Sequence, residues 1–222
     1  MLVENIVRNT TRYREFWDDS GKQVIFAKPY FTVDARGELT LHHSPPSPLP
    51  IPKDGLPDEV RGGLLKDGRF GPLRRLARRL RLHHVARKFA RFQPFPEYNS
   101  RSSEGWRLLR AILLRWIREH GDPSRIVIMP IPLYQYVEGL ASARPYQARF
   151  AELCAETGCL LHDPLPDLLR YTPTERRAFR FQTDAHFTPE GHAAIAKSMA
   201  PVISSLMARA AGGTTNPGTI IR

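Results

Sequence analysis

The chain has 222 residues, of which 41% are hydrophobic and 25% are charged, proportions that suit one folded domain with or without an insertion. Its 33 Lys and Arg outnumber its 22 Asp and Glu, so the formal net charge at pH 7 is +11. No apolar run approaches the roughly 18 residues of a membrane-spanning helix, and no basic region followed by an apolar segment opens the chain. We therefore expect a cytoplasmic protein with neither a transmembrane span nor a signal peptide.

The first third of the sequence predicts an irregular, partly extended region. Short apolar runs alternate over residues 22–41 on either side of Gly37, which indicates a β-hairpin or an irregular insertion. The segment Ser44–Pro57 that follows contains six prolines and predicts a loop, partly in the polyproline II conformation. This loop separates the start of the chain from a basic helical region.

The basic region, Arg61–Phe92, has eight Lys or Arg between Arg74 and Arg91. Its two apolar stripes fall on opposite faces of a straight helix, so we expect a break near residues 81–84. These basic residues form either the solvated face of a lid-like insertion or a binding site for an anionic partner such as an acidic glycan or a membrane surface. The candidate anion-binding residues are Arg74, Arg75, Arg78 and Arg79. No aromatic residue alternates with these arginines, so we predict no specific nucleic-acid binding.

The second half of the chain alternates helices and strands. Ser103 is a predicted cap for a helix over 104–120, and Gly158 is a predicted stop for a helix that begins near Pro145. The other predicted elements are buried strands over 126–131 and 159–163, a short helix over 164–169 and a last helix over 189–208. This order predicts an α/β fold with right-handed crossovers and a ligand site beyond the carboxyl ends of parallel strands.

An acid and an imidazole stand two residues apart in Thr183-Asp184-Ala185-His186, just before the last helix. In extended backbone such residues point to the same side, so Asp184 can accept from Nδ1–H of His186 and leave Nε2 free as a base. Thr188 is the predicted N-cap and Pro189 the first helical residue. The alternative interpretation of an isolated Asp-x-His is a surface loop.

The segment from Thr183 to His192 resembles the last conserved block of the SGNH (GDSL-like) hydrolase superfamily. Its Asp-x-His spacing is similar to that of the alginate and polysaccharide O-acetyltransferase-like branch. Val3–Asn9 resembles the block that supplies the oxyanion-hole Asn, here Asn5, and residues 28–39 look like an insertion that follows it in some members. The resemblance implies a partial three-layer, flavodoxin-like parallel sheet with a basic helical insertion.

The resemblance also implies a division of the chain and a reaction. The expected parts are 1–21 as the end of a core strand with the Asn block, 22–102 as the insertion, 103–210 as the α/β core and 211–222 as a disordered tail. The implied catalytic residues are His186, Asp184 and Asn5. The implied chemistry is hydrolysis of an ester, in a small molecule or a glycan, or acyl transfer involving a carbohydrate hydroxyl, without a metal or organic cofactor.

The chain departs from the family because it contains no Gly-Asp-Ser nucleophile block. Ser20 follows no apolar run and is interpreted as a turn residue. We therefore expect this chain to be the C-terminal part of a hydrolase whose serine is encoded upstream, and to be inactive alone.

Several polar residues have structural interpretations. We interpret Asp163 as a cap for the turn after a strand, Glu190 as a complement to the helix dipole, and His162 and His192 as structural or exposed. Cys154 and Cys159 form no zinc pattern and are expected as reduced thiols, with a bridge as the alternative. Two other functional classes stay open: a binding protein that uses the basic insertion, and a degenerate hydrolase that regulates a partner.

Overall fold

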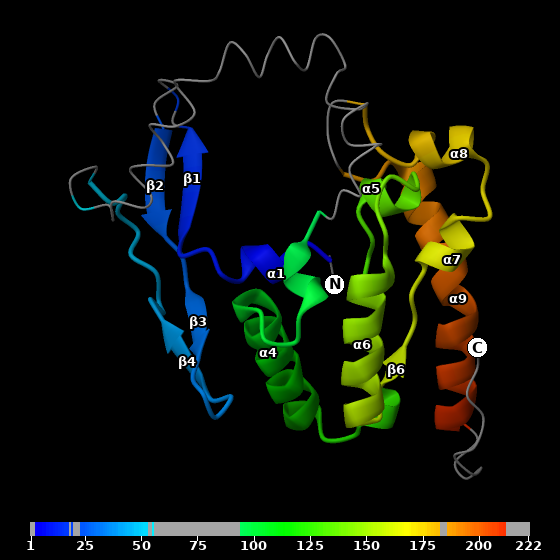
Figure 1. Cartoon of the computed structure of the whole chain (residues 1–222), viewed down its shortest axis with the longest axis horizontal. Coiled ribbons are helices and arrows are strands. Elements are labelled where there is room, and N and C mark those ends of the chain that lie inside the picture. The colour runs from blue at the N-terminus through cyan, green and yellow to red at the C-terminus, as the bar shows by residue number, and fades with distance from the viewer. Residues whose placement is uncertain are drawn as a thin grey trace. The chain divides into compact units, whose positions relative to one another are not determined.

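The computed structural model describes residues 3–17, 19, 23–52, 55, 94–182 and 186–211, which form a mixed α/β protein (Figure 1). Ser20, Asp184, the basic region Arg61–Phe92 with its four candidate arginines, and residues 212–222 lie outside the described residues. Packing divides the chain into two compact units. The hairpin unit comprises the described parts of Glu4–Leu113 with Leu140–Ser142, and the parallel-strand unit comprises Val3, Leu114–Gly139 and the described residues from Ala143 onward.

The hairpin unit contains two antiparallel hairpins where the sequence predicted one. Strand β1 (Tyr13–Trp17) pairs with β2 (Gln23–Ala27), and β3 (Tyr30–Val33) pairs with β4 (Leu39–His42). The predicted start of the hairpin over 22–41 was therefore wrong, because β2 pairs with β1, which precedes it in the chain. The second turn is closed by Asp34, whose Oδ1 accepts from the backbone N–H groups of Arg36 and Glu38 at 2.8 and 2.9 Å.

The start of the hairpin unit is also helical at Asn5, where we expected the end of a core strand with the Asn block. Asn5–Arg8 form the single helical turn α1, in which Asn9 N–H donates to the carbonyl of Asn5 at 2.9 Å. Further along lie the 3-10 turn η2 (Pro96–Asn99) and helix α4 (Glu104–His120), whose predicted bounds are confirmed. Ser103 is the cap, since its Oγ accepts from Trp106 N–H at 3.3 Å and donates to the Glu97 carbonyl.

The buried apolar side chains of the hairpin unit come mainly from η2 and α4. They are Ile6, Ile25, Phe95, Tyr98, Trp106, Leu108, Leu109, Ala111 and Leu113. The rings of Tyr98 and Trp106 lie 5.9 Å apart between centroids.

The parallel-strand unit contains the parallel pair that the sequence predicted. Strand β5 (Val127–Ile128) pairs with β6 (Leu160–Leu161), and helix α6 (Arg144–Thr157) lies between them in the chain and packs beside β6 (Figure 1). Gly158, at φ +77°, ends α6 as predicted. Both strands are shorter than predicted, because Pro130 and Pro164 lack the N–H that would continue the ladder.

Four more helices and a short turn complete this unit. They are η3 (Pro123–Arg125), α5 (Tyr134–Val137), α7 (Leu165–Leu168), α8 (Pro173–Ala178) and α9 (Pro189–Ala211). Helix α7 contacts both α5 and α9, and α8 also contacts α9. Tyr136, Tyr146, Phe150, Leu153 and Leu168 are among its buried side chains, each at most 2% exposed. Val3 N–H donates to the carbonyl of Ile131 at 3.0 Å, just beyond β5. Among the described helices, none is long and apolar enough to cross a membrane.

Candidate active site

His186 lies on an exposed loop whose two arms are paired. Phe181 N–H donates to the carbonyl of His186 at 3.2 Å, Arg180 and Phe187 form an antiparallel bridge, and Thr188 N–H donates to the carbonyl of Phe179 at 2.9 Å. We call the described residues 179–182 and 186–188 the His186 loop. Asp184 lies outside the described residues, so its contact with His186 stays a prediction.

The loop leads directly into α9 through the predicted cap. Thr188 Oγ1 accepts from Gly191 N–H at 3.3 Å and donates to the carbonyl of Ala178 at 2.8 Å. The predictions that Thr188 caps the helix and that Pro189 begins it are therefore confirmed. Two hydrogen bonds lower the pKa of Glu190 in the first turn of α9, the stronger one from the backbone N–H of Glu190 and the weaker one with Thr188. The lowered pKa favours the charged carboxylate near the positive end of the helix.

Gly191 allows α9 and the loop to approach each other closely. A Cβ atom at this position would lie 2.5 Å from the carbonyl oxygen of Phe179 and 2.7 Å from Cδ1 of Phe187. Both neighbours belong to the His186 loop, and one of them is backbone. The glycine is therefore required for the loop to pack on the first turn of the helix.

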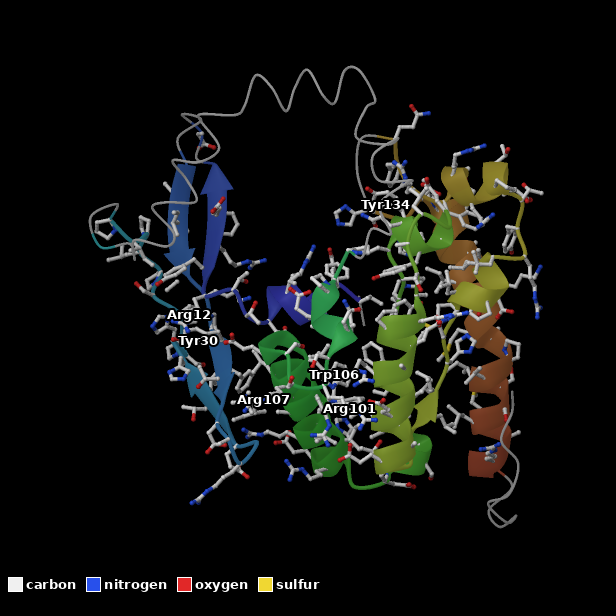
Figure 2. The ribbon with its side chains drawn as sticks, in the orientation of Figure 1. Arg12, Tyr30, Arg101, Trp106, Arg107 and Tyr134 are labelled. Atoms are coloured by element: carbon white, nitrogen blue, oxygen red, sulfur yellow. The ribbon has the colours of Figure 1, made fainter. Side chains whose placement is uncertain are left out.

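A second anchor of the loop is the side chain of Arg180, which the sequence did not reveal. Its Nε donates to Oε1 of Glu138 at 2.6 Å, and the two side chains are only 24% and 11% exposed. Its guanidinium carbon lies 4.5 Å from the centroid of the Tyr134 ring. Tyr134, which Figure 2 labels, belongs to helix α5. Because α5 follows β5 in the chain, the loop is tied to the segment beyond the carboxyl end of that strand. An Arg and a Glu 42 residues apart give no local signal of this pair.

Asp163, two residues after β6, accepts hydrogen bonds from three protein groups. Its Oδ1 accepts from Leu165 N–H at 3.0 Å, its Oδ2 accepts from Nε2 of Gln147 at 2.7 Å, and the Tyr146 hydroxyl lies 3.3 Å from both oxygens. Burial raises the pKa of Asp163, and these hydrogen bonds act in the opposite direction. The interpretation of Asp163 as a turn cap is confirmed.

His162 and Ser198 are close, but they do not form a nucleophile and base. Nε2 of His162 lies 2.9 Å from Oγ of Ser198, and that hydroxyl donates to Oδ2 of Asp167 at 2.7 Å. Because the serine proton points to the carboxylate, His162 must be the donor to Oγ and cannot accept from it. Ser198 is also only 9% exposed, within α9. The contact has a structural role, as expected for His162.

Asn5 is half-buried and lies on α1 in the hairpin unit. The preceding residue, Glu4, forms an ion pair of 2.6 Å with Arg8. His186 belongs to the parallel-strand unit. The expectation that Asn5 and His186 share one site stays a prediction.

Two further expectations concern cysteines and metals. Cys154 and Cys159 are free and buried, with their Sγ atoms 3.1 Å apart, and burial raises the pKa of Cys154. The described residues contain no group of three or more His, Cys, Asp or Glu that could hold a metal ion.

Comparison of the chain with family models, curated proteins and solved structures gave no match.

Proposed function

We propose that this chain provides the base and one oxyanion donor of a serine esterase of the SGNH/GDSL type. The observation that carries the proposal is the His186 loop, which presents an exposed histidine two residues before Thr188, the cap of α9, in an α/β unit. A general base must be accessible to substrate and held in place; the exposed position of His186 and the bond from Phe181 N–H to its carbonyl support this role. The order of the Asn and His blocks in the sequence adds support.

The proposed roles follow from the chemistry of each side chain. His186 Nε2 accepts the proton of a serine hydroxyl as that oxygen attacks the ester carbonyl. Asp184 accepts from Nδ1–H, which holds the ring and stabilises the imidazolium. The side-chain amide of Asn5 donates a hydrogen bond to the negatively charged oxygen of the tetrahedral intermediate.

We also propose that the chain belongs to a three-layer, flavodoxin-like fold with a parallel sheet. The β5–β6 pair with its α6 crossover is the kind of unit from which such sheets are built. The hydrogen bond from Val3 to Ile131 supports a further extended segment next to β5. Ligands of such sheets bind beyond the carboxyl ends of the strands, the side on which α5 follows β5.

The proposed substrate is an ester of a small molecule or a glycan, with water or a carbohydrate hydroxyl as the acyl acceptor. The sequence has no Gly-Asp-Ser block, so we propose that the nucleophile is encoded upstream of Met1. The mechanism as proposed uses neither a metal nor an organic cofactor.

The test compares the 222-residue chain with a longer protein extended into the upstream coding sequence, using p-nitrophenyl acetate and a fluorophosphonate label for reactive serine. We expect activity and labelling in the longer protein only. Serine-dependent turnover by the shorter chain would show that an upstream serine is not needed.

Variants of the longer protein test the assigned roles. We expect His186→Ala to lower kcat/KM by about 10²–10⁴ and Asn5→Ala to lower it by about 10²–10³. His120→Gln, on the exposed last turn of α4, is the matched control and should be neutral. Turnover that survives His186→Ala would contradict the proposal.

A further inference from the structure

The two arms of the His186 loop are joined by backbone hydrogen bonds. Within the described residues, Phe181 N–H bonds to the carbonyl of His186, and the bond from Thr188 to Phe179 closes the base of the loop. Each such bond contributes modestly in water-accessible surroundings, and an exposed loop is costly in conformational entropy to hold in one conformation. A side chain that reaches from the loop to a separate element adds a constraint on where the imidazole lies.

Arg180 is that side chain. Its Nε bonds to Glu138, its guanidinium carbon lies over the Tyr134 ring, and its Nη1 lies 3.4 Å from the carbonyl oxygen of Phe181. Phe181 in turn bonds to His186 through its N–H. A continuous path of contacts therefore runs from α5 through Arg180 and Phe181 to His186.

The pair differs from an ordinary surface ion pair of the same unit. Arg170 and Asp167 are three residues apart, separated by 3.4 Å and exposed by 81% and 38%, whereas Arg180 and Glu138 are joined at 2.6 Å in a largely buried contact. Exposed local pairs contribute little, but the loss of one partner from a buried pair leaves an uncompensated charge. Lysine cannot replace Arg180 fully, because only a planar guanidinium can cover a ring and donate from its edge at once.

We infer that Arg180 is a positioning residue for His186 and that it aligns the proposed base through its contacts with Glu138 and Tyr134. The inference rests on the proposed function for its catalytic meaning. The effect of Arg180 on the His186 loop can be measured without any enzyme activity.

The first experiment measures amide hydrogen exchange and the imidazole NMR signals of His186 in the 222-residue chain. Arg180→Gln should speed exchange at Phe181 by about tenfold or more, the loss expected when a hydrogen bond to a charged group is removed. It should also shift the His186 ring signals. The amide of Leu160, bonded to Ile126 in the parallel pair, is the internal reference and should be unaffected. Arg170→Gln is the matched control.

The outcomes separate positioning from general stability. An equal change at Phe181 and Leu160 would mean that Arg180 only stabilises the unit, and an unchanged His186 signal would overturn the inference. Arg180→Lys should restore part of the wild-type signature.

A second experiment uses the longer, serine-containing protein. There Arg180→Gln should lower kcat by at least about tenfold with KM nearly unchanged, since a misplaced base affects the chemical step more than substrate binding. An equal rise in KM without a fall in kcat would contradict positioning. If that protein hydrolyses no ester at all, the proposed function fails, while the exchange result still decides the role of Arg180 in the loop.

Discussion

The two segments that carry the proposed catalytic residues are held in different ways. The His186 loop is anchored by distant contacts, with Arg180 reaching Glu138 over 42 residues and Thr188 reaching Ala178 over 10. The Asn5 turn is held by local bonds within α1 and by the ion pair of Glu4 with the exposed side chain of Arg8. Its distant contacts include Lys28, whose Nζ donates to the carbonyl of Arg8 at 2.5 Å, and the fully buried Ile6, which lies against Gly105 of α4.

The difference shows what each kind of anchor can do. A single helical turn is marginal by itself, because nucleating a helix fixes several residues for one hydrogen bond. A loop that is joined at its base, at its cap and through a largely buried ion pair has more contacts to offset the conformational entropy lost when one side chain is ordered. We therefore expect the imidazole of His186 to be more rigidly placed, within its own unit, than the amide of Asn5 within its unit.

The largest expected effect is at Gly191, where the loop meets α9. Gly191→Ala places a methyl group against the Phe179 carbonyl and the Phe187 ring, and overpacking of this kind costs about 3 kcal/mol at the upper end of its usual range. Urea unfolding of the variant measures the loss. Gly121→Ala is the contrasting variant, because a Cβ there meets open space at a φ of +80°, whereas Gly191 is helical and is not among the glycines with positive φ; the pair therefore separates backbone strain from steric clash. A neutral Gly191→Ala would show that the loop can move away from the helix without cost.

A smaller effect is expected at the cap of α9. Thr188→Val keeps the shape of the side chain but removes both the acceptor for Gly191 N–H and the donor to the Ala178 carbonyl. Loss of a helix cap costs about 0.5–2 kcal/mol, and we expect the upper part of that range because Thr188 is only 9% exposed. Thermal unfolding checks the value, and Thr188→Ser should retain most of the stability. A loss of stability in Thr188→Ser but not in Thr188→Val would assign the effect to packing of the methyl group.

The smallest effect is expected in the Asn5 turn. Glu4→Gln removes the charge of a pair in which Arg8 is 59% exposed, and such pairs contribute about 0.2–1 kcal/mol. We expect the lower end, below about 0.5 kcal/mol, and a further decrease when salt is added. Urea unfolding at low and high salt measures both quantities. A loss comparable to that of Gly191→Ala would abolish the distinction between the two segments.

The sequence predicted those features of the fold and site that depend on neighbouring residues. Ser103, Gly158 and Thr188 marked the ends of three helices correctly, because a cap is made by hydrogen bonds within one turn. Asp163 was likewise interpreted correctly as a cap, since its bond to Leu165 is local. The parallel pair followed from the order of helices and apolar runs.

Tertiary structure decided the features that depend on which distant segments meet. The partner of β2 proved to be β1, a choice that the alternation of apolar residues does not encode because the same pattern suits either neighbour. The contacts of Arg180 with Glu138 and Tyr134, and the close approach of Gly191 to Phe179, also arise only when the chain has folded. Local hydrogen bonds are determined by a few consecutive residues, whereas the position of the proposed base depends on packing between elements far apart in the chain.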